Sequence, residues 1–204
     1  MLGLPPDLRV TARDPARELA GWLGVEATAR LVRHYRYAEE RLMRTMAGWI
    51  ALTPELPAKL LLGRQVWECA QHADLWGKRL PELRAPAQVS EPPSAAFARL
   101  MDALENREAW GETVERLTGV YRVLKPHLAE VYSRHLERAN PVYEPPTRRI
   151  LERCLAEERR HITEGERVLA ALADTDARRD RVAAWQVELG RLVTEAGGVT
   201  GAGE

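Results

Sequence analysis

The chain has 204 residues, 45% of them hydrophobic, and its 30 basic and 30 acidic side chains leave a formal net charge of zero. This balance excludes a broad basic surface for nucleic acid and an acidic, disordered chain, and no apolar run reaches the roughly 18 residues of a membrane span. The start also lacks the basic and apolar regions of a signal peptide, so we expect a cytoplasmic protein without membrane or nucleic-acid partners.

Ala, Leu, Arg and Glu dominate the sequence, and turns that contain Pro or Gly divide it into predicted helices. A short helix is expected over about 15–23, a long helix over about 25–51 and another over about 55–80. The stretch that begins at Pro81, PELRAPAQVSEPPS, contains four prolines and predicts a crossover without helix.

A second helical half follows the crossover. Ser94 can cap a helical region that runs to about 138, and its length predicts a break or bend, with Pro126 as one obvious point. Further helices are expected over about 147–173 and about 176–196, and the sequence has no alternating strand pattern. These elements predict an all-α fold, most simply an antiparallel four-helix bundle with an extra short helix at the N-terminus and at the C-terminus.

The helices predict one domain over residues 1–196, followed by a mobile tail over residues 197–204. The two cysteines, Cys69 and Cys154, fall inside predicted helices and form no C-x-x-C pair. We therefore expect two reduced, buried thiols.

An internal repeat links the two halves of the chain. At an offset of 89 positions, residues 57–83 align without gaps with residues 146–172. Seven aligned pairs are identical, and they include a glutamate and a histidine four positions apart: Glu68 with Glu157, and His72 with His161.

The repeated motif is suited to metal binding. Residues four apart on a helix project from nearly the same side, so each Glu–His pair can converge on one ion. Two such helices facing each other would bring two carboxylates and two imidazoles around a shared point. Mixed oxygen and nitrogen ligands of this kind suit iron, manganese or zinc. The alternative is a pair of helix-surface contacts or a satisfied hydrogen bond in the core.

A carboxylate from each remaining helix would complete such a site. Glu39 lies four positions after Tyr35 and three before Leu42, so it faces the apolar side of its helix. Burial would require a partner for this carboxylate, either a cation or an arginine such as Arg64 or Arg153.

On the third helix the candidate carboxylate is Glu130. The local context of Ala129 and Glu130 is similar to that of Glu39, but the apolar stripe of this helix does not centre on Glu130. His127 and Glu137 are therefore kept as alternatives.

The order of these residues resembles the ferritin-like superfamily of di-iron and di-manganese carboxylate proteins. The resemblance spans about 39–172 and rests on six residues: Glu39, Glu68 with His72, Glu130, and Glu157 with His161. It implies a four-helix bundle whose halves are joined by a long crossover. It also implies two transition-metal ions, iron or manganese with zinc as a further option, held by these six residues. No residue is assigned a catalytic role.

One feature departs from the family, whose usual spacing is Glu-x-x-His. Both copies of the motif here use a spacing of four. Glu158 does lie three positions before His161, but the matching position in the first copy is Cys69. Glu157 is therefore preferred as the ligand, with Glu158 as the alternate.

The resemblance implies an oxygen-activating oxidoreductase that acts on an unknown small substrate. The expected partners are that substrate or dioxygen, with a homodimer as an option. The absence of marked acidity favours an organic substrate over iron handling of the ferroxidase type. A metal-free helical bundle that serves as a binding or scaffold module is the alternative from another class.

Overall fold

The computed structural model describes residues 22–201, and all regular structure within this range is helical. Its helices have the following bounds: α2 Val25–Leu52, α3 Leu56–Arg79, η2 Pro81–Leu83, α4 Ala95–Glu105, α5 Thr113–Thr118, η3 Gly119–Leu124, α6 Lys125–Arg138, α7 Pro145–Leu172 and α8 Asp176–Ala196. The prediction of an all-α fold is confirmed for the described range. The short helix expected over about 15–23 lies almost wholly outside it.

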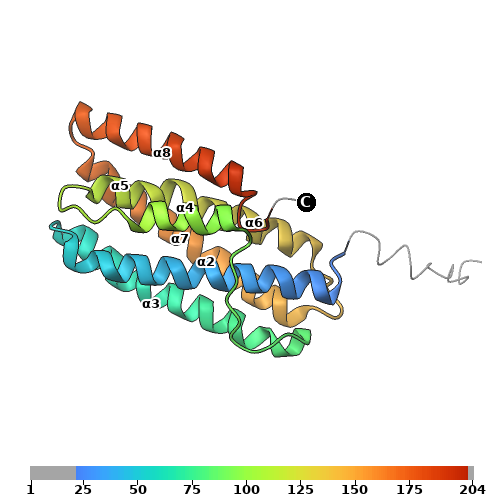
Figure 1. Ribbon diagram of the computed structural model, residues 1–204. Coiled ribbons are helices and arrows are strands. Elements are labelled where there is room, and N and C mark those ends of the chain that lie inside the picture. Colours follow the sequence, from blue (N-terminus) through green and yellow to red (C-terminus); the bar gives the residue numbers. More distant parts are fainter. Residues whose placement is uncertain (1–21, 202–204) are drawn as a thin grey trace, which may run out of the picture.

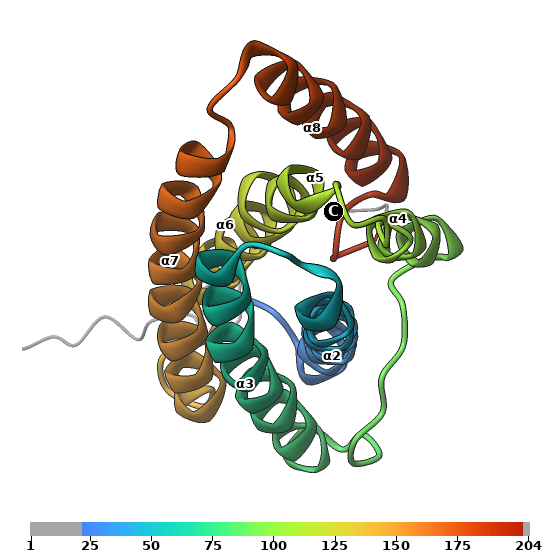
Figure 2. The same ribbon diagram turned by 90° about the vertical axis from the view of Figure 1, so that its left-hand side faces the viewer.

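Four columns of helix form the predicted bundle. α2 and α3 make one antiparallel hairpin, α6 and α7 make the other, and α5 and η3 extend α6 at its N-terminal end (Figure 1). Seen from the end, α3 and α7 lie side by side, and α2 and α5–α6 complete the bundle (Figure 2). The proline-rich segment between η2 and α4 joins the two halves, which confirms the expected crossover.

The core follows from apolar side chains at steps of three and four. On α2 this buried face consists of Leu31, Tyr35, Ala38, Leu42, Met46 and Trp49. Removing each large apolar side chain from water contributes roughly 1.5–3 kcal/mol, so this face holds α2 against the rest of the bundle. Glu39 lies within the same face and is fully buried.

The long helical region expected from Ser94 is interrupted at residues 106–112, between α4 and α5, and not at Pro126. The fully buried Arg116 accounts for this position. Its Nε donates to the carbonyl oxygen of Arg107 at 2.6 Å, and its Nη2 donates to that of Ala109 at 2.8 Å. The Arg116 side chain therefore satisfies carbonyl oxygens that the break in the helix leaves without partners. The periodicity of apolar residues does not reveal such a contact.

Pro126 lies at the beginning of α6 instead of ending a helix. Pro126 lacks an N–H for the regular helical ladder, and it follows directly on a helical segment whose hydrogen bonding is already irregular. The preceding segment η3 is a π-helix, which changes the register of the column just before α6. After this change of register, α6 buries Lys125, Leu128, Val131, Tyr132 and His135.

α8 covers the outside of the bundle by packing on α4 and α5 (Figure 1). Of the segment 197–204 that was expected to be mobile, residues 197–201 are described. Val199 in this segment is fully buried, and its amide donates to His127 Nε2 at 2.9 Å. The division into one domain and a tail stays a prediction. Among the described helices, none combines the length and apolar character needed to cross a membrane.

Candidate metal centre

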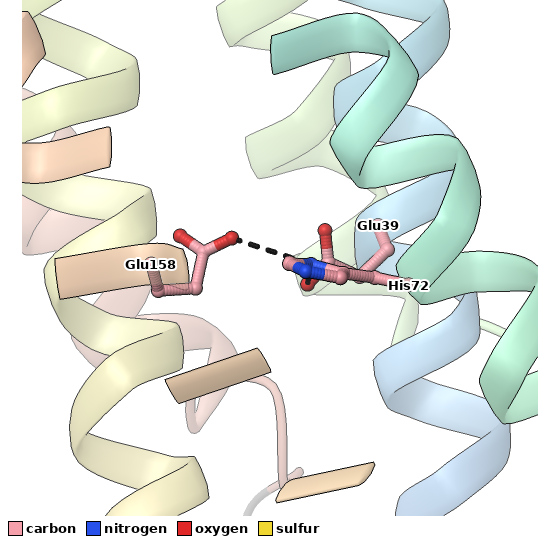
Figure 3. A group of neighbouring side chains, drawn as sticks. All are labelled: Glu39, His72 and Glu158. Atoms are coloured by element: carbon pink, nitrogen blue, oxygen red, sulfur yellow. Dashed lines mark hydrogen bonds and ion pairs between the residues drawn. The ribbon is translucent and has the colours of Figure 1, made fainter. Parts of the chain in front are cut away.

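Three side chains from three helices meet inside the bundle. Glu39 from α2, His72 from α3 and Glu158 from α7 are fully buried and face one another (Figure 3). His72 Nδ1 lies 3.0 Å from Glu39 Oε1 and 3.6 Å from Glu158 Oε1. One ligand atom from each residue lies within 4.8 Å of the other two. Two carboxylates and an imidazole at these spacings suit a transition-metal ion.

Glu39 keeps one oxygen without a partner. The Tyr132 hydroxyl donates to Glu39 Oε1 at 2.9 Å, whereas Glu39 Oε2 is buried and makes no hydrogen bond. An unpartnered carboxylate oxygen is costly in the core, and a bound cation would satisfy it. The arginines that were considered as partners of Glu39 form ion pairs elsewhere: Arg64 with Glu164, and Arg153 with Glu157.

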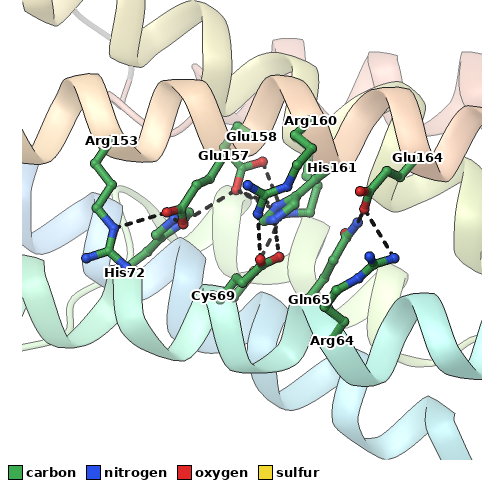
Figure 4. A network of polar contacts seen from close by, with 12 residues as sticks. Arg64, Gln65, Cys69, His72, Arg153, Glu157, Glu158, Arg160, His161 and Glu164 are labelled. Atoms are coloured by element: carbon green, nitrogen blue, oxygen red, sulfur yellow. Dashed lines mark hydrogen bonds and ion pairs between the residues drawn. The ribbon is translucent and has the colours of Figure 1, made fainter.

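The histidines of the repeated motif each contact the glutamate of the other copy. His72 Nε2 lies 2.7 Å from Glu157 Oε2, and His161 Nε2 lies 2.6 Å from Glu68 Oε2. The two imidazole rings stack, with centroids 6.2 Å apart and planes 25° apart. These contacts run between α3 and α7 (Figure 4), so the four residues lie together through pairs across helices and not within one helix.

The contact with Glu157 leaves His72 Nδ1 facing the two buried carboxylates. The hydrogen bond from His72 lowers the pKa of Glu157 to about 2, so Glu157 is an ionised acceptor. Burial opposes the charge of His72, but Glu39 and hydrogen bonds with Cys154 and Glu157 raise its pKa well above the usual value. A metal ion would replace the proton at Nδ1, while the Nε2–H bond to Glu157 would orient the ring.

Lys125 belongs to the same cluster, and sequence reasoning missed it. This lysine is fully buried, and its Nζ donates to both oxygens of Glu158 at 2.9 and 3.0 Å. The same Nζ lies 3.0 Å from His161 Nδ1 and 3.5 Å from Cys69 Sγ. Burial opposes its charge, but the neighbouring acidic groups Cys69, Glu158 and Glu39 raise the pKa of Lys125 above its usual value.

A signal for Lys125 was present in the sequence. Lys125 lies four positions after Tyr121 and three before Leu128, and both of these apolar residues are buried. This is the same spacing that placed Glu39 on the apolar face of its helix.

Glu158, which was predicted only as the alternate to Glu157, faces His72 Nδ1, whereas Glu157 contacts Nε2 of the same ring. It is fully buried, whereas the side chain of Glu157 is 19% exposed. Burial would raise the pKa of Glu158, but Lys125 above all, and then His161 and His72, lower it to about 2. Glu158 is therefore an anionic candidate ligand at neutral pH. It also has the usual family spacing, three positions before His161.

Glu130 does not join this cluster. Its side chain is 57% exposed and forms an ion pair with Arg134, one turn later on α6. Leu128 and Tyr132 define the buried face of α6, and Glu130 is two residues from each, about 200° around the helix. Both alternatives lie elsewhere as well: His127 beside the segment after α8, and Glu137 on the exposed side of α6.

Cys69 and Cys154 are buried and form no disulfide, as expected. Burial raises the pKa of both thiols, so they are neutral at pH 7. Cys69 lies three positions before His72, the place that Glu158 takes relative to His161. A neutral thiol therefore stands where the second copy has a carboxylate.

A hollow of about 630 Å³ is lined by residues of α2, α6 and the segment after α8, among them Tyr35 and His135, and by none of Glu39, His72 and Glu158. The Tyr35 hydroxyl lies 3.1 Å from His135 Nδ1. The rings of Tyr35 and Tyr132 meet edge to face with centroids 5.0 Å apart, and Tyr132 donates to Glu39. Aromatic side chains thus connect the hollow to the candidate metal centre.

No protein-family model matches the chain, and no curated protein matches it either. The structure is similar to that of a dodecameric thioferritin, the bacterioferritin-related protein from Bacteroides fragilis, with a TM-score of 0.53 and 16% sequence identity. The match covers 79% of this chain and 95% of that chain. The helical bundle, its crossover and this similarity together show that the chain has a ferritin-like fold.

Proposed function

We propose that this protein binds a transition-metal ion, iron or manganese ahead of zinc, and is an oxygen-activating oxidoreductase that acts on a small molecule. Glu39, His72 and Glu158 would hold the ion. The observation that carries the proposal is the meeting of three fully buried ligand groups, one of which keeps an unpartnered oxygen, Glu39 Oε2. Carboxylates are seldom fully buried without a cation or another charged partner.

The chain's own residues would prepare the ligands. Iron or manganese bound here would supply redox chemistry toward dioxygen. Glu157 would hold the His72 ring with Nδ1 toward the ligand site, since the other ring nitrogen of a ligating histidine usually donates to such a group. Tyr132 would fix Glu39 Oε1 and leave Oε2 for the ion. Lys125 would keep Glu158 ionised, and the apolar core around the site would exclude water.

A small organic substrate is supported by a hollow that the rings of Tyr35 and Tyr132 connect to the centre. Its volume of about 630 Å³ falls within the roughly 300–1,000 Å³ of ordinary ligand pockets. Tyr35 and His135 bring hydrogen-bonding groups to its wall, and His135 Nε2 is buried without a hydrogen-bond partner. A polar group on the substrate would satisfy that nitrogen.

Metal content and dioxygen consumption test the proposal together. The protein would be reconstituted with ferrous iron under argon and desalted, and its iron measured by mass spectrometry before exposure to air. Glu39→Gln should lose most of the iron and the dioxygen uptake, because it removes an anionic ligand at nearly constant size. Glu40→Gln is the matched control, since Glu40 is half-buried and pairs with Arg36 and Arg44. Wild-type protein without iron, or Glu39→Gln with full iron, would refute the proposal.

Iron handling of the ferroxidase type is the second candidate, because the similar solved structure is described as a thioferritin. Repeated additions of ferrous iron distinguish the two candidates: storage retains many ferric ions in each assembly, whereas the proposed oxidoreductase stays at its initial iron content. A metal-free scaffold would bind none. The homodimer stays a prediction for this chain, and light scattering during size-exclusion chromatography would test it.

A further inference from the structure

We propose that Lys125 takes the place of a second metal ion, so that this ferritin-like centre holds one metal ion per chain instead of two. The inference deepens the proposed function and rests on metal binding at Glu39, His72 and Glu158. It departs from the pair of ions that the resemblance implies.

The surroundings of the two stacked histidines point to Lys125 as the replacement for a second metal ion. Each ring uses Nε2 to contact a glutamate of the facing helix. The Nδ1 atoms then differ in what they face: His72 Nδ1 lies 3.0 Å from Glu39 Oε1, whereas His161 Nδ1 lies 3.0 Å from Lys125 Nζ. The ammonium of Lys125 on α6 therefore stands beside His161 in the way that the carboxylate of Glu39 on α2 stands beside His72.

Lys125 already contacts the ligand atoms that a second metal ion would need. An ammonium has three N–H groups, and Lys125 Nζ has acceptors within reach in Glu158 Oε1, Glu158 Oε2 and His161 Nδ1, at 2.9, 3.0 and 3.0 Å. The remaining neighbour, Cys69 at 3.5 Å, supplies a single sulfur where the second copy of the motif has the carboxylate of Glu158. A second cation would have to expel the lysine from His161 Nδ1, which has a single lone pair, whereas each oxygen of Glu158 has a second lone pair for the first ion.

The fully buried charges also fit one divalent ion. Glu39 and Glu158 are acidic and Lys125 is basic, which leaves one net negative charge among these three buried groups. One divalent ion would leave a net charge of plus one among these buried groups, but a second would raise it to plus three in the protein interior. The outer glutamates are already paired with arginines of α7: Glu157 with Arg153, and Glu68 with Arg160.

Iron stoichiometry with electron paramagnetic resonance tests the inference. After reconstitution with ferrous iron, desalting and oxidation, the wild-type protein should hold one iron per chain and give the signal of an isolated high-spin ferric ion. Lys125→Glu should hold two irons per chain, and coupling between the two ferric ions should remove most of that signal. Lys78→Glu is the matched control, because Lys78 is an exposed lysine of α3, and it should stay at one iron.

Two irons per chain in the wild-type protein would overturn the inference and leave the proposed function standing. No iron in the wild-type protein would overturn both. A folded Lys125→Glu that stays at one iron would also contradict the role of Lys125. If circular dichroism shows that this variant does not fold, Lys125→Ala, which only removes the ammonium and its stem, should bind more than one iron per chain.

Discussion

Replacing Lys125 by methionine removes the ammonium but keeps an apolar side chain of similar length. The variant leaves Glu158 fully buried without the N–H groups that reach its oxygens at 2.9 and 3.0 Å. At an effective dielectric constant of about 20, two unit charges about 3 Å apart attract each other by about 5 kcal/mol. Breaking a buried ion pair costs about 3–5 kcal/mol. We therefore expect metal-free Lys125→Met to lose about 3–5 kcal/mol of the free energy of unfolding.

Urea unfolding at pH 7 with a chelator, followed by circular dichroism, measures this loss. The double variant Lys125→Met/Glu158→Gln removes both charges and should recover most of the stability, with a coupling energy of about 2 kcal/mol or more. Lys78→Met serves as the control because its partner Asp74 is exposed, so its cost should be about 0.5 kcal/mol or less. A Lys125→Met protein as stable as this control would refute the assignment of Lys125 as the charged partner of Glu158.

Three further predictions follow from neighbouring contacts. Glu157→Gln should weaken iron binding about 10–100-fold in a chelator competition, because it loosens the histidine ligand; an unchanged affinity would contradict this role. Burial, helped by Arg138, lowers the pKa of His135 to about 4, so neutral His135 contributes stability above pH 6.5 that is lost as pH falls from 6.5 toward 4. Replacing His135 by Gln should remove up to about 3 kcal/mol of that pH dependence in acid unfolding, and an identical profile would count against it. Gly165→Ala would place a Cβ 2.1 Å from the Tyr121 ring and should cost about 1–3 kcal/mol in thermal unfolding, whereas Gly63→Ala, with open space around it, should stabilise by up to about 1 kcal/mol.

The helices on either side of the crossover were predictable because their apolar stripes and proline turns are local signals. The expected ends of the helix over about 25–51 and of the helix over about 176–196 lie within a residue of α2 and α8. The break between α4 and α5 was misplaced, because it depends on the side chain of Arg116 returning to the loop carbonyls. That contact links residues on two elements, and periodicity within one helix does not report it.

The candidate site was predictable to the extent that its residues lie on apolar faces or in the repeat. Glu39 and His72 were found in this way. Glu130 was chosen by analogy with Glu39, but the π-helical segment before α6 and the proline at its start set a different face toward the bundle. Lys125 was missed because a search for metal ligands does not consider a cation. Glu158 ranked behind Glu157 because the matching residue in the first copy is Cys69.

Anomalous diffraction from crystals of the iron-loaded protein would test the one-metal centre most directly. The expected result is a single iron peak per chain, bound by Glu39, His72 and Glu158, with Lys125 Nζ still in contact with Glu158. Two iron peaks, or one peak between Glu68 and His161 with Lys125 displaced, would contradict it.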